Sequence, residues 1–135
     1  MPPVFNHNHF KILAIELFNK SIDICPSDCN IEAIYRTIIN RLYYSSFLHA
    51  REWLDVKHNF KTKKPTRRNN LPSEHTQVIN KLSYMNKKKA SQKLWKLKEY
   101  RHKSDYNVKV SDVITEEDVT FVLKLSDIII GDLSF

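Results

Sequence analysis

Glycine is nearly absent from this sequence of 135 residues, in which Gly131 is the only example. Tight hairpins and the glycine-rich loops that cradle phosphate groups both depend on glycine, because its backbone reaches conformations that other residues avoid. The shortage therefore argues against a sheet built from hairpins. It also excludes nucleotide binding through a P-loop or a dinucleotide-binding fingerprint.

Long hydrophobic segments are missing too. No run of apolar residues comes near the roughly 20 that a membrane-spanning helix needs. The first ten residues, MPPVFNHNHF, also lack the basic and apolar pattern of a secretory signal. We therefore expect a cytoplasmic protein that does not contact a membrane.

Cysteine occurs only twice, at Cys25 and Cys29. Two cysteines are too few for a disulfide framework, and the expected cytoplasmic location disfavours a bridge between them. A zinc site would need further ligands, and His7 and His9 lie too far away along the same predicted helix to supply them. The sequence predicts neither a metal nor a cofactor.

Positive charge is concentrated in the middle of the chain. Residues 1–55 carry five basic and six acidic side chains, residues 56–110 carry sixteen and three, and residues 111–135 carry one and six. The middle alone is therefore 16 − 3 = +13, against +7 for the whole chain. Such asymmetry indicates an anionic partner, with RNA or DNA first, although a lysine-rich face also serves solubility.

Hydrophobic periodicity predicts an all-α protein, an up-and-down antiparallel bundle of about five helices in a single domain of residues 1–135. We expect the helices over residues 9–24, 31–56, 73–85, 87–108 and 115–131. The first carries an apolar stripe of Phe10, Leu13, Leu17 and Ile24, which Ala14, Phe18 and Ile22 widen. Thr115, followed by three acidic residues, is typical of a helix N-terminus.

The second predicted helix is apolar on two sides, which is typical of a central helix. One stripe contains Ile31, Ile34, Ile38, Leu42, Ser45, His49 and Trp53, and the other contains Ile39, Tyr43, Phe47, Ala50 and Leu54. Arg41 lies beside these stripes, so its charge needs a partner. We expect Arg41 with an acidic partner, and Tyr44 through its hydroxyl group, to be polar residues of the core rim or of an interface.

A basic loop is predicted at about residues 56–72, and it contains no acid between Asp55 and Glu74. The loop is near the upper length limit for a connection that has no function in a compact domain. The candidate RNA-binding residues are Lys61, Lys63, Lys64, Arg67 and Arg68. The alternative is an unstructured connection without a ligand.

The segment LKEYRHKSDY, residues 97–106, ends the apolar stripe of the fourth predicted helix. The stripe contains Ala90, Leu94 and Leu97 and then reaches Arg101, where a hydrophobic residue would continue it. Arg101 and Asp105 are four residues apart, so they could form an ion pair within the helix. The pair therefore serves either the structure or a functional site.

Two motifs resemble those of the small single-domain HEPN proteins of bacteria and archaea. The segment NRLYYSSFLHAREWL resembles the family's RxYYxxFxxA pattern through Arg41, Tyr43, Tyr44, Phe47 and Ala50. The segment LWKLKEYRHKSDY resembles its RxxADY pattern through Arg101, Asp105 and Tyr106. The resemblance covers roughly residues 10–133 and includes His75, in a segment where this group commonly has a histidine.

The resemblance implies a helical bundle that often dimerises and that belongs to a toxin–antitoxin or antiviral defence module. Many members are metal-independent ribonucleases with an RxxxxH motif, and many are paired with a minimal nucleotidyltransferase. Arg101 matches the motif arginine and His102 suits the polar second position. The distal histidine is missing, because residues 105–108 read DYNV.

Cleavage of RNA without a metal requires proton transfers and stabilisation of a charged phosphorane. Histidine suits the proton transfers, and arginine suits the phosphorane. The candidate catalytic residues are therefore Arg101, His102, Asp105 and Tyr106, although Asp105 and Tyr106 equally suit a structural or dimer-interface role. The histidines 49, 58 and 75 are more typical of surface or core-rim positions. The alternative function is a non-catalytic interaction module that partners a nucleotidyltransferase or another effector.

Overall fold

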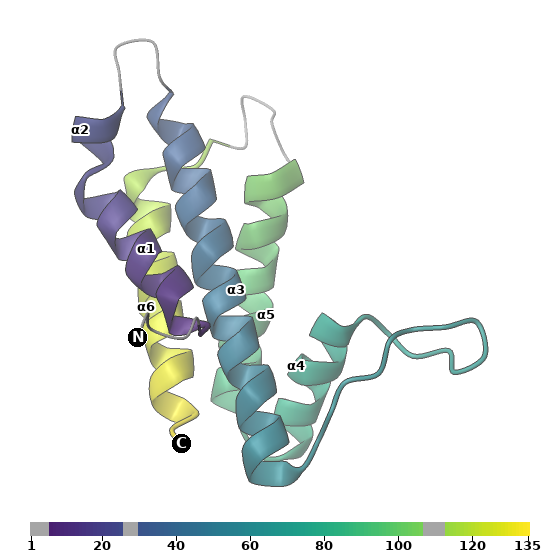
Figure 1. The fold of residues 1–135 in the computed structure, drawn as a ribbon. Helices are drawn as coiled ribbons and strands as arrows, with labels where there is room; N and C mark the ends of the chain where they lie inside the picture. The colour runs from purple at the N-terminus through teal and green to yellow at the C-terminus, as the bar shows by residue number, and fades with distance from the viewer. Residues whose placement is uncertain (1–5, 26–29, 107–112) are drawn as a thin grey trace, which may run out of the picture.

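The computed structural model describes residues 6–25, 30–106 and 113–135 (Figure 1). Within these ranges the chain is all helical, as predicted. The helices are α1 (Asn8–Asn19), α2 (Ser21–Ile24), α3 (Ile31–His58), α4 (Glu74–Tyr84), α5 (Lys88–Tyr106) and α6 (Glu116–Asp132). One hydrophobic cluster takes residues from α1, α3, α4, α5 and α6.

The first predicted helix is divided into two, so the described residues form six helices instead of five. The break lies at Lys20, whose backbone leaves the helical region with φ −106° and ψ 10°. Ser21 Oγ donates to the carbonyl of Phe18 at 2.9 Å, which satisfies an acceptor that the break would leave open. The predicted stripe of this first segment is also partly wrong, because Leu13, Ile22 and Ile24 are exposed, whereas Ala14 is buried as predicted.

The long helix α3 lies at the centre of the bundle, with α1 and α6 on one side and α4 and α5 on the other (Figure 1). Both predicted apolar stripes of α3 contribute to the core. Their fully buried members include Ile38, Leu42, Tyr43 and Leu54. This confirms the prediction of a central helix, and it leaves α3 as the surface against which the other helices are positioned.

The helix termini follow the signals in the sequence. Asn30 accepts a hydrogen bond from the backbone N–H of Glu32 at the start of α3, and Ser73 accepts one from Thr76 at the start of α4. Thr115 and Asp118 form a reciprocal capping box at the start of α6. Side-chain acceptors satisfy N–H groups that a helix N-terminus otherwise leaves open, which explains why these starts were predictable.

The basic loop forms an arm that projects from the bundle beside α4 (Figure 1). It begins later than predicted, because α3 continues to His58 and the arm comprises residues 59–73. Asn59 ends α3 in the left-handed conformation, with φ 51°, and its N–H donates to the carbonyl of Asp55 at 3.0 Å. Asparagine tolerates this conformation, which glycine would otherwise supply in a chain that has almost none.

Candidate functional site

Arg101 lies on the face of α5 that packs against α3, and its side chain is 19% exposed. Its Nε donates to Asp105 Oδ2 at 3.1 Å, and its Nη2 donates to the hydroxyl of Tyr44 at 3.4 Å. Its guanidinium carbon lies 5.5 Å and 5.6 Å from the ring centroids of Tyr43 and Tyr44. The apolar stripe of α5 thus ends in a cation held against aromatic rings, where it also contributes cation–π energy.

Both carboxylate oxygens of Asp105 are engaged. Nδ2 of Asn40 on α3 lies 3.1 Å and 3.3 Å from the two oxygens, and Arg101 occupies one of them as well. The ion pair that the spacing of residues 101 and 105 allows is therefore present and is tied to α3. In this arrangement Asp105 orients Arg101.

Arg36 on α3 fixes the C-terminal end of α5. Its Nη1 donates to the carbonyls of Lys103 and Ser104 at 3.0 Å and 2.9 Å. Its Nη2 forms an ion pair with Glu32 at 2.9 Å, and Glu32 also accepts from the backbone N–H of Ile114 at 2.9 Å. A cation at a helix C-terminus satisfies open carbonyls and complements the helix dipole. The turn of α5 that carries Arg101 and Asp105 is therefore held in place.

His75, the second residue of α4, joins the same cluster. Its Nδ1 contacts the hydroxyl of Tyr43, and its ring stacks on Phe47 with centroids 4.1 Å apart. Burial lowers the pKa of His75, and the nearby charges of Arg101 and Lys98 lower it further. The sequence predicts a surface or core-rim position for His75 and does not indicate this neighbourhood. The histidine of the family resemblance was the one available signal, because no spacing connects residues 75 and 101.

His102 and Tyr106 lie at the outer edge of this cluster. Both are exposed, and their ring centroids are 4.9 Å apart along α5. The Tyr106 ring also lies 5.9 Å from the guanidinium carbon of Arg101. Successive helical residues point about 100° apart, so His102 leaves α5 in a different direction from Arg101. Positions 107 and 108, where the missing histidine was also expected, lie outside the described residues.

The candidate residues of the central helix contact two different neighbours. Tyr44 belongs to the Arg101 cluster, as the hydrogen bond from Nη2 shows. Arg41 is half-buried on the side of α1, and its guanidinium carbon lies 5.4 Å from the ring centroid of Phe10. Among the described residues, the Arg41 guanidinium therefore contacts this aromatic ring, whereas an acidic partner was expected. Arg41 does not join the cluster around Arg101.

The basic arm is held by hydrogen bonds and is not an unstructured connection. Gln77 on α4 accepts from the backbone N–H of Lys63 at 2.9 Å, and its Nε2 donates to the carbonyls of Lys63 and Pro72 at 2.6 Å and 3.0 Å. One side chain thus clamps both limbs of the arm. The five candidate RNA-binding residues are all exposed, namely Lys61, Lys63, Lys64, Arg67 and Arg68.

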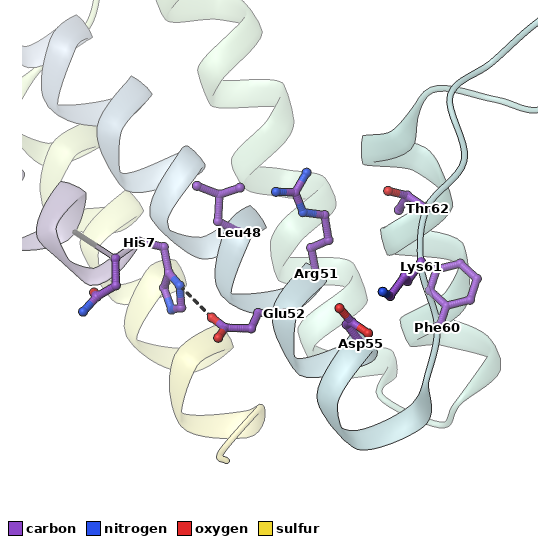
Figure 2. Close-up of a pocket in the computed structure, with 9 residues that line it drawn as sticks. His7, Leu48, Arg51, Glu52, Asp55, Phe60, Lys61 and Thr62 are labelled. Carbon is purple, nitrogen blue, oxygen red and sulfur yellow. Dashed lines mark ion pairs between the residues drawn. The ribbon is translucent and has the colours of Figure 1, made fainter. Parts of the chain in front are cut away.

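A pocket of about 510 Å³ lies between α3, the residues before α1 and the root of the arm (Figure 2). On one side His7 Nδ1 pairs with Glu52 at 3.0 Å, and on the other Lys61 comes from the arm. Arg51 stands between them, and Asp55 also lines the pocket. The pocket thus combines the two carboxylates with the cations of Arg51 and Lys61, so its lining does not select for either sign of charge.

The remaining expectations concern metals and membranes. In the described ranges, no group of three or more His, Cys, Asp or Glu side chains is placed to hold a metal ion. Cys25 is half-buried, while Cys29 lies outside the described residues. Of the helices in these ranges, none has both the length and the apolar character needed to cross a membrane.

Comparison with known protein families, with curated proteins and with solved structures finds no match to this chain.

Proposed function

We propose that this chain is a HEPN-type, RNA-binding component of a toxin–antitoxin or antiviral defence module. The observation that supports this proposal most is the environment of the Arg101 guanidinium. Its guanidinium lies on aromatic rings, and its Nη1 donates no hydrogen bond to any described residue. A fixed guanidinium with open donors suits a phosphate oxygen, and the exposed ring of Tyr106 beside it suits an RNA base. The basic arm adds an exposed surface for the RNA backbone.

Metal-independent cleavage of the bound RNA is the reaction that this site would support. Arg101 would stabilise the charged phosphorane, and His102 would transfer protons to or from the reacting oxygens. The Tyr106 ring contacts both side chains. RNA lying across Tyr106 would therefore reach Arg101 and His102 together, although the two point in different directions from the helix.

The test is incubation of the pure protein with single-stranded and structured RNA in the presence of EDTA. Arg101→Ala and His102→Ala should each reduce cleavage, and Arg101→Ala should also weaken binding measured by fluorescence anisotropy. Gln92→Ala, an exposed change on the same helix, is the matched control. Absence of cleavage, or a cleavage rate that neither substitution changes, would reject the enzymatic form of the proposal. The anisotropy measurement would then decide on RNA binding alone.

A second candidate function is a non-catalytic interaction module that binds a nucleotidyltransferase, another effector or a second copy of this chain. Tyr106 favours it, because this large aromatic side chain is 60% exposed at the end of α5. Exposed tyrosines are typical anchors of protein interfaces. On this alternative, Tyr106→Ala should disrupt assembly in size-exclusion chromatography while RNA affinity stays unchanged.

A further inference from the structure

The tautomer of His75 follows from its contact with Tyr43. The Tyr43 side chain is fully buried, and its hydroxyl group has Nδ1 of His75 as its recorded hydrogen-bond partner. A buried hydroxyl hydrogen needs an acceptor, so this hydroxyl donates to Nδ1. A neutral imidazole that accepts at one nitrogen carries its hydrogen on the other. His75 therefore presents Nε2–H as a donor.

The surroundings keep His75 in this neutral form. Burial lowers its pKa, and so do Arg101 and Lys98 on α5 and Arg51 on α3, whereas Glu74 opposes them. Protonation would also place a second N–H against the Tyr43 hydroxyl, whose own hydrogen would then lose its acceptor. Burial raises the pKa of Tyr43, so the hydroxyl keeps that hydrogen.

The His75 residue is partly exposed at the start of α4. Among the described residues, the buried side-chain nitrogen and oxygen atoms without a hydrogen-bond partner are Ser45 Oγ and Ser104 Oγ. Nε2 of His75 has no recorded partner and does not belong to this buried group. Its N–H is consequently open to a ligand.

Two cations stand beside this donor. Lys98 Nζ donates to the hydroxyl of Thr76, the neighbour of His75, at 3.2 Å, which leaves two of its three hydrogens open. Arg101 keeps Nη1 without a hydrogen bond among the described residues, and its guanidinium lies over the same Tyr43 that holds His75. Lys98 and Arg101 therefore each keep N–H groups that donate no hydrogen bond to a described residue. Two acidic groups lie near these cations: Glu74, which accepts a hydrogen bond from the hydroxyl of Thr62 at 2.6 Å, and Asp105, both of whose oxygens are engaged.

We propose that the Nε2–H of His75, the ammonium of Lys98 and the guanidinium of Arg101 bind one phosphate group, with Tyr43 as the positioning residue that holds His75 as a neutral donor. The ligand is a phosphodiester of RNA, so this site rests on the function proposed above and deepens it. Three donors around one phosphate supply hydrogen bonds from two cations and one dipole. The neutral donor adds specificity of direction without a further charge that the buried ring would disfavour.

Nuclear magnetic resonance of the protein labelled with ¹⁵N at histidine tests the tautomer directly. The His75 resonances should report hydrogen on Nε2 at neutral pH in the wild type. Tyr43→Phe removes the donor to Nδ1, so it should give a mixture of both tautomers. A wild-type His75 that carries its hydrogen on Nδ1, or that is protonated at neutral pH, would overturn the inference whether or not RNA binds.

Binding tests the ligand, with inorganic phosphate and a short single-stranded oligouridylate as probes. His75→Ala should weaken oligouridylate binding on the order of tenfold, as expected for one hydrogen bond to a charged group. His75→Gln should restore much of the affinity, because its amide nitrogen lies near the position of Nε2, whereas His75→Asn should not. Gln92→Ala is the control, and circular dichroism confirms that each variant is folded.

The outcomes separate the two proposals. Oligouridylate binding that is unaffected by His75→Ala overturns the phosphate site and leaves the proposed function standing. Inorganic phosphate could shift the Nε2 resonance of His75 while the protein shows no binding to RNA. That result would support the phosphate site and would reject RNA as its ligand. A Tyr43→Phe variant that is folded, retains the wild-type tautomer and binds RNA fully would contradict the positioning role.

Discussion

The buried hydroxyl group of Tyr43 on α3 contacts Nδ1 of His75 on α4. These two helices are separated along the chain by the basic arm, so the contact fixes the start of α4 against the central helix. It also brings a histidine into the neighbourhood of Arg101, which belongs to a third helix. The hydrogen bond therefore contributes both to the fold and to the candidate site.

Removal of the Tyr43 hydroxyl should lower stability and change its dependence on alkaline pH. Tyr43→Phe should cost about 1 kcal/mol near neutral pH, because a buried hydrogen bond is lost. The raised pKa of Tyr43 means that the unfolded chain releases this proton first. Wild-type stability should therefore fall as the pH rises above about 10, and the variant should fall less steeply. Urea unfolding over this range measures both effects. Tyr84→Phe, at an exposed position, should behave like the wild type.

Glu32 should make the protein sensitive to acid. The N–H of Ile114 and then Arg36 hold the pKa of Glu32 below its ordinary value of 4.5. The stabilisation from this carboxylate is present above that value and is lost as the pH falls below it. Glu32→Gln should reduce stability at neutral pH and flatten its decline toward acid. Urea unfolding measures this, and Glu99→Gln, which removes an exposed carboxylate from α5, is the control. Equal slopes for Glu32→Gln and the wild type would refute the prediction.

Gln77 should control the order of the basic arm. Gln77→Ala removes three hydrogen bonds that join α4 to both limbs of the arm. The arm contains several lysine and arginine residues, so the variant should be cut there by trypsin at least several-fold faster. Its thermal midpoint should change little, because the arm is exposed. Asn80→Ala, at an exposed position on the same helix, should keep the wild-type cleavage rate.

Ser46 and Ser126 should show strong energetic coupling. Their Oγ atoms lie 2.9 Å apart between α3 and α6, and both residues are fully buried. Ser46→Ala should cost about 1 to 3 kcal/mol, because the Ser126 hydroxyl loses its recorded partner in a dry core. The double change to alanine should cost less than the sum of the two single changes. Chemical denaturation of the four proteins provides the measurement, and strict additivity would contradict the coupling.

Much of the fold was predictable because its signals are local. The two stripes of α3, the caps at Ser73 and Thr115 and the shortage of glycine all act within a few residues. The break at Lys20 was missed because apolar spacing continued through it, while the exposure of Leu13 depends on how α1 lies against α3. The HEPN resemblance and the function it implies stay predictions, as do the catalytic roles of Arg101, His102, Asp105 and Tyr106.

The sequence by itself determined that the chain is helical, that α3 is central and that a basic segment interrupts the bundle, because periodicity, capping and charge are properties of neighbouring residues. Only the tertiary structure decided that His75 belongs with Arg101 and Lys98. It also decided that the guanidinium of Arg41 lies over the ring of Phe10. These relations join residues that lie far apart along the chain. They follow from the way in which α3, α4 and α5 bury their shared apolar surface, which no local pattern encodes.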